Sequence, residues 1–215
     1  MEKSAKSAKI SKKDSPMYKI APLLLLLLTA CNSEQPITQI PITIEHQKNI
    51  TDDFSKQDSS WSIKTGQWSF ENGILKQSAT NESFPLILLE KEKLSDVDVS
   101  VKFRPISGKI DASGGLVFRA VDKDNYYIVR ANALEDNFRL YTFKNGRRSE
   151  IASATVTPPT LGAFHTIRVV AKGEHIQAYL DGKLYINHND GSFSEGYVGL
   201  WTKADSVTEF DDFQY

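Results

Sequence analysis

The chain has 215 residues, 40% of them apolar, with 26 Lys and Arg against 27 Asp and Glu, a net charge of −1 and a single cysteine. This length is that of one domain able to bury a sizeable core. The near balance of charge, without basic blocks, excludes nucleic acid as the main partner, because phosphate binding needs a concentrated basic surface. One cysteine also excludes an internal disulfide.

Residues 1–30 have the layout of an export signal. Residues 1–19 carry six lysines against two acids, and an apolar run from Ile20 to Ala30 follows. A membrane-spanning helix needs about 20 apolar residues, so this run is about half long enough and instead matches the apolar part of a signal peptide. Translation from Met17 would give a more compact signal of the same kind, and it is kept as an alternative start.

The only cysteine, Cys31, closes this segment in the order Leu28-Thr29-Ala30-Cys31. This order resembles the lipobox of bacterial lipoproteins. The resemblance implies cleavage before Cys31, a diacylglyceryl group on its thiol and an acyl chain such as palmitate on the new amino terminus. Because more than one chain gives stable anchoring, it implies membrane attachment through Cys31. The alternative is an ordinary signal followed by a chance cysteine.

A lipobox also implies a location. The protein would be lipid-anchored in the bacterial cell envelope and not cytoplasmic, and Asn32 after the cysteine favours the outer membrane. Residues 31–215 keep 20 Lys and Arg against 25 Asp and Glu, a net charge of −5. Residues 31–50 are expected to carry the lipid and a proline-containing tether, with a short edge strand over Ile40–Ile44.

Residues 51–215 are predicted to be one all-β domain. Polar and apolar residues alternate perfectly over 98–104, as in a half-buried strand, and no sustained helical period occurs. Asn145-Gly146 and Asp181-Gly182 are strong hairpin signals. Strands are expected at 98–104, 115–119, 126–131, 138–144, 148–152, 165–172, 175–180, 184–186, 196–202 and 207–215.

Ten to thirteen short strands, with turns every eight to twelve residues, predict an antiparallel two-sheet jelly-roll β-sandwich. Alternation also assigns the interior rows. These are expected to be Val99, Val101 and Phe103; Leu116 and Phe118; Ile167, Val169 and Ala171; and Ile176, Ala178 and Leu180. Arg119, Arg130, Arg168 and Gln177 are expected on the opposite sides of their strands.

Four segments in order resemble the concanavalin A-like jelly-roll superfamily: TDDFS…WSIKTGQWSFENGILKQ (51–77), SGGLVFRAVDKDNYYIVRA (113–131), HTIRVVAKGEHIQAYLDGKLYI (165–186) and GYVGLWTKADSVTEFDDF (196–213). Within it, the chain resembles levan-binding modules of fructan-degrading enzymes and the 3-keto-disaccharide hydrolase domain of bacterial lipoproteins. These motifs are mostly turn and core features, and one such fold hosts many functions.

No catalytic set can be assigned from the sequence. Glycoside hydrolases of this superfamily carry E-x-D-x-x-E on one strand, and the nearest match, residues 209–214, has Gln in place of the last acid. We interpret it as coincidence. His165 and His175 begin neighbouring strands and could meet, although solvated strand-end histidines are the more ordinary case.

The resemblance also implies a structural Ca²⁺ held by a carboxylate of the last strand. Asp211 matches that position, with Asp52 or Asp53 beside it, and Ca²⁺ is bound by carboxylate and carbonyl oxygens. The alternative is that Asp211 and Asp212 only protect an edge strand from pairing.

Aromatic and polar side chains on one face predict a sugar-binding surface, because rings pack against the apolar faces of sugars while Arg, Asp and Asn bind the hydroxyl groups. The candidate ligand-binding residues are Arg119, Asp124, Asn125, Tyr126, Arg130, Tyr141 and Trp201. Arg139 shares a face with Tyr141. The alternative interpretation makes the aromatic residues part of the core and the arginines a solvated stripe; Trp61 and Trp68 are expected to pack in the core.

The leading hypothesis is an envelope-anchored lipoprotein whose jelly-roll domain binds a glycan or oligosaccharide without catalysis. The alternatives are a glycoside or 3-keto-glycoside hydrolase and, since laminin G-like domains of this fold bind proteins, a structural or protein-interaction module of the envelope.

Overall fold

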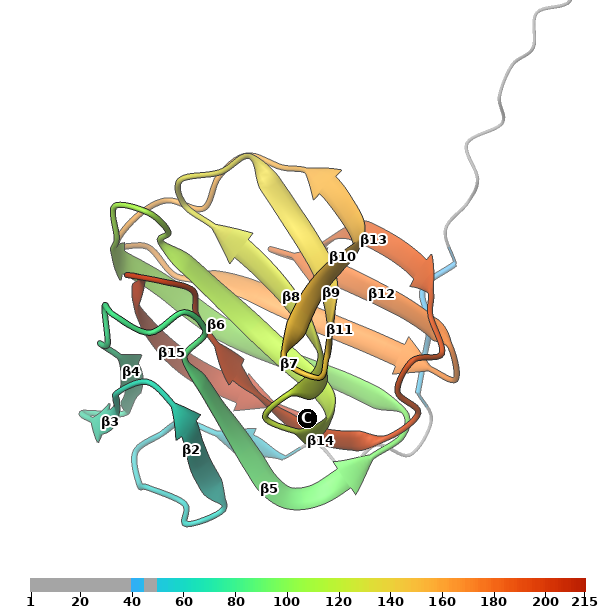
Figure 1. Ribbon diagram of the computed structural model, residues 1–215, viewed down its shortest axis with the longest axis horizontal. Coiled ribbons are helices and arrows are strands. Elements are labelled where there is room, and N and C mark those ends of the chain that lie inside the picture. The colour runs from blue at the N-terminus through green and yellow to red at the C-terminus, as the bar shows by residue number, and fades with distance from the viewer. Residues whose placement is uncertain (1–39, 45–49) are drawn as a thin grey trace, which may run out of the picture. The chain divides into compact units, whose positions relative to one another are not determined.

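A computed structural model describes residues 40–44 and 50–215 (Figure 1). These residues form fifteen strands in two antiparallel sheets, which pack as a sandwich, and they contain no helix. Within them, accordingly, no helix is long and apolar enough to cross a membrane. The predicted all-β jelly-roll class is therefore confirmed. Cys31 and the rest of residues 1–39 lie outside the described residues.

The eight-stranded sheet runs in the order β13-β12-β11-β6-β15-β4-β3, and β1 also pairs with β15. Its strands are β1 (Thr51–Asp52), β3 (Trp68–Glu71), β4 (Ile74–Gln77), β6 (Val97–Ser107), β11 (His165–Lys172), β12 (His175–Leu180), β13 (Lys183–Asn189) and β15 (Val207–Gln214).

The seven-stranded sheet runs in the order β10-β9-β8-β7-β14-β5-β2. Its strands are β2 (Trp61–Thr65), β5 (Leu86–Leu94), β7 (Ser113–Asp122), β8 (Asn125–Asn132), β9 (Asn137–Lys144), β10 (Arg147–Thr155) and β14 (Gly196–Trp201).

Every strand predicted from residue 98 onward is present within a few residues of its expected bounds. The two hairpin dipeptides also adopt the expected turns, with positive φ at Asn145, Gly146, Asp181 and Gly182. The predicted interior rows are all buried between the sheets, together with Trp61 and Trp68.

A second apolar layer lies on the outer face of the seven-stranded sheet. It is separate from the core between the sheets and comprises Leu86, Leu88, Val117, Ala120, Tyr126, Ile128, Tyr141, Phe143 and Trp201, with Phe84 and Tyr197 packed against it. Strand β8 explains this arrangement, because its sequence Tyr-Tyr-Ile-Val is apolar at successive positions and therefore apolar on both faces.

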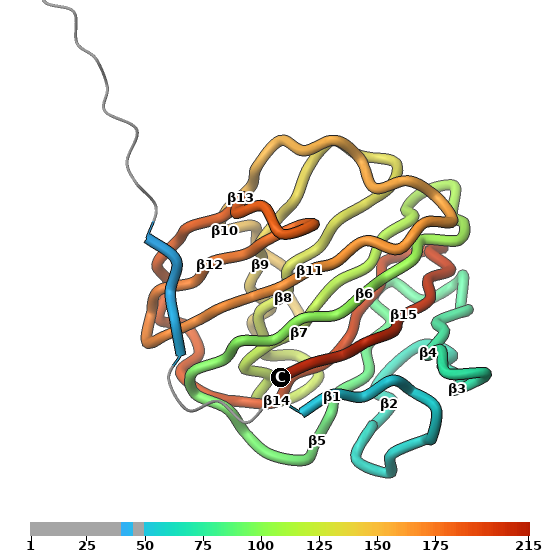
Figure 2. The backbone as a smooth tube through the Cα atoms, turned by 180° about the vertical axis from the view of Figure 1, so that it is seen from behind, coloured from blue at the N-terminus to red at the C-terminus, as the bar shows by residue number. Residues whose placement is uncertain are grey.

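The segment 40–44 lies beside β12 (Figure 2). Gln177 of β12 accepts a hydrogen bond from Ile42 N at 2.8 Å and donates one to Ile40 O at 3.0 Å. The expected edge strand is wrong, since 40–44 forms no strand. Pro41 has no backbone N–H to donate. The segment is held to β12 by the side-chain amide of Gln177 and not by backbone pairing with a neighbouring strand.

Candidate functional site

Three arginines lie on the outer face of the seven-stranded sheet, one on each of three neighbouring strands. Arg130 is in β8, Arg139 in β9 and Arg148 in β10. Arg130 and Arg139 are directly paired across the sheet, and Arg148 is paired with Phe143 of the outer apolar layer. We call these three residues the arginine row.

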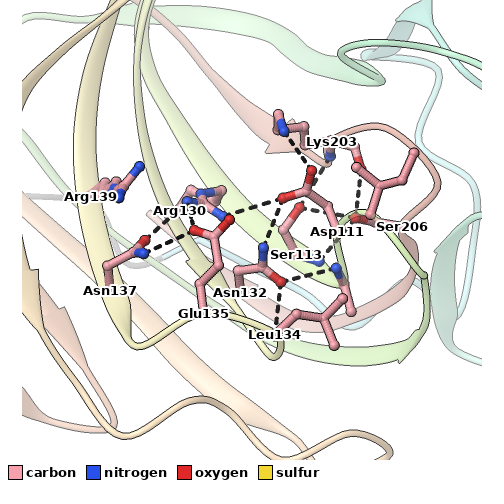
Figure 3. Close-up of polar contacts among 12 residues, drawn as sticks. Asp111, Ser113, Arg130, Asn132, Leu134, Glu135, Asn137, Arg139, Lys203 and Ser206 are labelled. Carbon is pink, nitrogen blue, oxygen red and sulfur yellow. Dashed lines mark hydrogen bonds and ion pairs between the residues drawn. The ribbon is translucent and has the colours of Figure 1, made fainter.

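Arg130 is the most buried member of the row and is held on two sides (Figure 3). Its NH2 donates to Glu135 Oε2 at 2.7 Å and to Asn137 Oδ1 at 3.0 Å. Its NH1 lies 3.5 Å from Asp111 Oδ1. A guanidinium bonded on both sides cannot rotate freely, so its remaining N–H group has a fixed direction.

Asp111 is the buried anion that organises this end of the face. Its side chain is only 1% exposed, and it accepts from Asn132 Nδ2 at 2.8 Å and pairs with Lys203 Nζ at 2.5 Å. The carboxylate thus faces two cations, Arg130 and Lys203, which offset the cost of burying it.

Tyr141 joins the three arginines. Its hydroxyl lies 3.5 Å from Arg130 NH2 and 3.4 Å from Arg139 NH1. The guanidinium of Arg148 lies over its ring at 4.6 Å, and also over the rings of Phe84 and Trp201. Cation–π contacts of this kind fix an arginine while leaving its N–H groups at the ring edge available.

The arginine row contains buried donors without a protein acceptor. Among the described residues, the buried atoms Arg130 Nε, Arg139 Nε and Arg148 NH1 have no hydrogen-bond partner. Arg139 Nε lies 3.3 Å from Glu150 Oε2 as an ion pair without hydrogen-bond geometry. These three atoms have almost no accessible surface, and Arg119 NH2 and Tyr215 Oη, away from the row, are in the same state. The part of the row that a ligand can reach is therefore the exposed part, above all the Arg139 side chain, which is 35% exposed.

The carboxylate of Glu135, beside the row, is an acceptor only. Burial by itself would raise the pKa of Glu135, but hydrogen bonds from Arg130 and Asn137 outweigh it and hold this pKa below its ordinary value. Glu135 is therefore ionised at neutral pH, and it complements the arginines by accepting hydrogen bonds.

A cavity of about 240 Å³ lies at one side of this face. The loop 78–85 forms one wall, and the β7–β8 and β9–β10 turns contribute Asp124 and Gly146. Phe84 of the loop stacks on Trp201, with ring centroids 5.7 Å apart. Gln77 fixes the loop through bonds to Ala79, Thr202 and Ser206.

The structure brings together five of the predicted ligand-binding residues. Tyr126, Arg130, Tyr141 and Trp201 lie on the outer face, as expected, and Asp124 lines the adjoining cavity. Asn125 ties the two neighbouring turns together by accepting from Asn145 N at 3.0 Å.

The predicted ligand-binding rings on this face, Tyr126, Tyr141 and Trp201, are buried. Trp201 is 0% exposed and Tyr126 1%, since Phe84 and Phe143 pack against them. Burial also raises the pKa of the Tyr126 hydroxyl. These rings therefore support the arginine row from below and cannot stack directly on a ligand in this conformation.

Arg119 does not lie on the face of Tyr126, so its expected placement is wrong. It has φ of 49° in a stretch where the pairing of β7 with β8 breaks. This bulge changes which side chains of β7 face the inside of the sandwich and which face outward. The side chain points toward Ser95 O and Phe193 O, at 2.7 and 3.2 Å, near the core ring of Tyr127.

The remaining candidates lie elsewhere. His165 and His175 are at opposite ends of an antiparallel pair, where they bond to Asp181 and Asn187 respectively, so the suggestion that they meet is wrong. In segment 209–214, Glu209 pairs with Arg104 and Lys76 on the eight-stranded sheet.

The calcium prediction remains untested. Asp211 Oδ1 accepts from Asp212 N, and Asp52 is bonded to Phe54 N and to Trp61 Nε1. No three His, Cys, Asp or Glu side chains gather as a metal site in the part of the chain that the structure describes. Calcium at Asp211 would therefore depend largely on backbone oxygens.

Sequence reasoning missed part of the site: Asp111, Glu135, Asn137, Arg148 and Lys203. Arg148 and Glu150 share a face by simple alternation in β10, which was a usable signal. Asp111 and Glu135 come from loops, and no periodicity predicts where a loop carboxylate points.

These features fit a known class of domain. Residues 48–214 match the family described as the 3-keto-alpha-glucoside-1,2-lyase-like domain, and the chain belongs to that family. The carbohydrate-binding module CBM66 from Bacillus subtilis superposes with a TM-score of 0.65 at 25% identity, covering 72% of this chain and 93% of that chain. The predicted resemblance to this class is confirmed.

Two further relatives are informative. Levanase from Bacillus subtilis (strain 168) is 29% identical over 164 residues, which are 74% of this chain and 23% of levanase, so the chain spans about a quarter of that enzyme's length. A beta-glucanase from Bacillus licheniformis shares the fold at 11% identity, with a TM-score of 0.56 over 79% of this chain and 98% of the glucanase chain.

Proposed function

We propose that the outer face of the seven-stranded sheet binds carbohydrate without catalysis, in a lipoprotein anchored to the bacterial cell envelope through Cys31. The observation that carries the proposal is the arginine row with its neighbouring carboxylates, in which the side chains of Arg139, Glu150 and Glu135 are 35%, 43% and 35% exposed. The names of the relatives, a carbohydrate-binding module and a levanase, support the same ligand class.

Sugars fit the donors and acceptors of this face. Each hydroxyl group both accepts and donates a hydrogen bond, so a diol can accept from a guanidinium and donate to a carboxylate. The face offers both, as Arg130 with Glu135 and as Arg139 with Glu150. Because the charges nearly balance, the arrangement suits a neutral ligand better than a phosphate or nucleic acid.

The anchoring part of the proposal rests on the sequence Leu28-Thr29-Ala30-Cys31. It is tested by the mass and detergent partitioning of the protein isolated from its native cells. Acylated, membrane-bound protein is expected, whereas soluble protein with an unmodified Cys31 would contradict anchoring.

Turnover of a 3-keto-glycoside or other glycoside is the second candidate, and the family description favours it. Against it, the carboxylates along the row are engaged with cations: Asp111 with Lys203, Glu135 with Arg130 and Glu150 with Arg139. Release of product from a keto-sugar or an oligosaccharide would support the hydrolase alternative. Co-purification of a protein partner, without retention of any glycan, would favour the alternative of an envelope interaction module.

The binding proposal is tested on a glycan array with the full chain and two variants. Arg139→Ala removes a partly exposed member of the row and is expected to weaken retention by about tenfold or more, because a charge-assisted hydrogen bond is lost. Arg168→Ala removes an arginine paired with Asp98 on the other sheet and is the matched control. Equal retention of both variants, or no retention of any glycan by the unmodified chain, would contradict the proposal.

A further inference from the structure

Two exposed aliphatic side chains border the arginine row. Ile110, in the loop between β6 and β7, is 70% exposed, and Leu134, in the turn between β8 and β9, is 45% exposed. Each is next in sequence to a residue that contacts Arg130: Ile110 precedes Asp111, and Leu134 precedes Glu135. We call Ile110 and Leu134 the aliphatic rim.

The loop of Ile110 is held rigidly. The carboxylate of Asp205 accepts from the backbone N–H groups of Lys109, Ile110 and Asp111, at 2.7, 3.0 and 3.0 Å. Gly108 lets the loop close, because a Cβ at this position would lie 1.7 Å from Asp111 O. The exposed isoleucine is therefore presented by a fixed backbone.

The turn of Leu134 is joined to that loop. Asn132 Oδ1 accepts from both Ala112 N and Leu134 N, at 3.0 and 3.1 Å, and Ala133 N donates to Ala112 O at 2.9 Å. Figure 3 shows Leu134 and Asp111 on either side of Asn132 in this network. The loops thus form one support for the row and the rim.

Scattered exposed aliphatic residues need no explanation, but Ile110 and Leu134 each adjoin in sequence a carboxylate that contacts Arg130. The rings of Tyr126, Tyr141, Phe143 and Trp201 are buried, so these four cannot contact the apolar C–H surfaces of a sugar chain. Preorganised side chains can bury such surfaces with little loss of conformational entropy.

We infer that Ile110 and Leu134 form a second subsite, which contacts the apolar side of the sugar unit next to the one bound by the arginine row. This inference rests on the proposed carbohydrate binding. It adds that the domain binds chains of at least two sugar units more tightly than single sugars, and that aliphatic side chains rather than aromatic rings supply the apolar contact.

The test uses the full chain and a length series of fructose and glucose oligosaccharides, from monosaccharide to hexasaccharide. The double variant Ile110→Ser/Leu134→Ser is expected to bind the longer members about tenfold more weakly, through lost apolar burial, and to bind the shortest retained member as before. The control Ile63→Ser/Val121→Ser changes two other exposed aliphatic residues, which are 49% and 50% exposed, and is expected to leave all affinities unchanged.

The outcomes separate this inference from the proposed function. If the rim variant binds oligosaccharides of every length as tightly as the unmodified chain does, the rim subsite alone is overturned. An equal loss at every length would also overturn it, because the rim would then act only by supporting the row. If the unmodified chain binds no member while remaining folded by its thermal melt, the proposed function fails for these sugars and the inference fails with it.

Discussion

Individual residues on the outer face of the seven-stranded sheet have roles that depend on burial as much as on chemistry. Tyr126 and Trp201 are on the face that alternation assigns to them, but Phe84 and Phe143 cover them. The alternation of residues along a strand predicts on which face of the sheet a side chain lies. It does not predict which residues cover that side chain, because some of them come from a loop. Arg148 lies over the rings of Phe84, Tyr141 and Trp201, and the proposed function assigns the binding chemistry to the arginines of this face.

Asp111 is the residue on which the polar network depends most. Asp111→Ala would leave Arg130 and Lys203 without their shared anion, and Arg130 is only 2% exposed. We expect the free energy of unfolding to fall by about 3 kcal/mol, measured by urea denaturation. The control Lys102→Ala breaks the exposed pair with Asp212 and should change the free energy of unfolding far less, because solvent screens an exposed ion pair. Similar values for the two variants would contradict the role of Asp111.

Tyr127 gives a pH dependence with a defined sign. Burial, and then the hydrogen bond to Asp190, raises the pKa of its hydroxyl to about 12. Since the unfolded value is about 10, the neutral phenol stabilises the fold at lower pH, and this contribution is lost as pH rises from about 10 to about 12.

Tyr127→Phe removes the titrating group, so stability should decline less steeply over that interval than in the unmodified chain. Urea denaturation at several pH values measures the difference. An identical decline in both proteins would show that Tyr127 does not titrate as its surroundings indicate.

At the scale of strands and turns, the sequence was most informative where local chemistry dictates the backbone. The strands from β6 to β15 and both hairpin dipeptides were predictable, because alternation and Asn-Gly or Asp-Gly act locally. The bulges at Arg119 and Asp212, where the strand pairing changes register, were not predictable, since no local pattern in the sequence predicts a positive φ at these non-glycine residues. The bulge at Arg119 is the reason why its predicted place on the outer face was wrong.

Gly146 tests the turn between β9 and β10. Its φ is 73°, and a Cβ there would meet only Asp124 Oδ1 at 3.5 Å, so Gly146→Ala probes backbone conformation rather than crowding. We expect a loss of about 1 kcal/mol in the free energy of unfolding, because the left-handed region disfavours a Cβ. Thermal or urea unfolding measures it, and a stability equal to that of the unmodified chain would contradict the assigned turn.

At the scale of the whole molecule, the domain buries two apolar layers, one between the sheets and one on the outer face of the seven-stranded sheet. The fold class and the family resemblance followed from the sequence, because strand patterning and turn spacing extend along the whole domain. The polar network was only partly predictable, since Asp111, Glu135 and Lys203 approach Arg130 or each other from separate loops. Their meeting is a property of the assembled fold.

The calcium prediction also belongs to the whole domain, because a metal at Asp211 would hold the last strand to its neighbours. If the ion is bound, EDTA should lower the melting temperature, since a ligand bound only by the folded state stabilises it. Added calcium should then restore the original value. An unchanged melting temperature in EDTA would mean that the domain holds no structural calcium.

The most direct measurement follows the side-chain Nε–H signals of arginine by NMR while the full chain is titrated with a glycan retained on the array. Our account predicts that the signals of Arg130 and Arg139 shift on binding, while those of Arg104 and Arg168, paired with Glu209 and Asp98 on the other sheet, remain in place. Shifts confined to Arg104 or Arg168, or binding that leaves the arginine row unaffected, would contradict it.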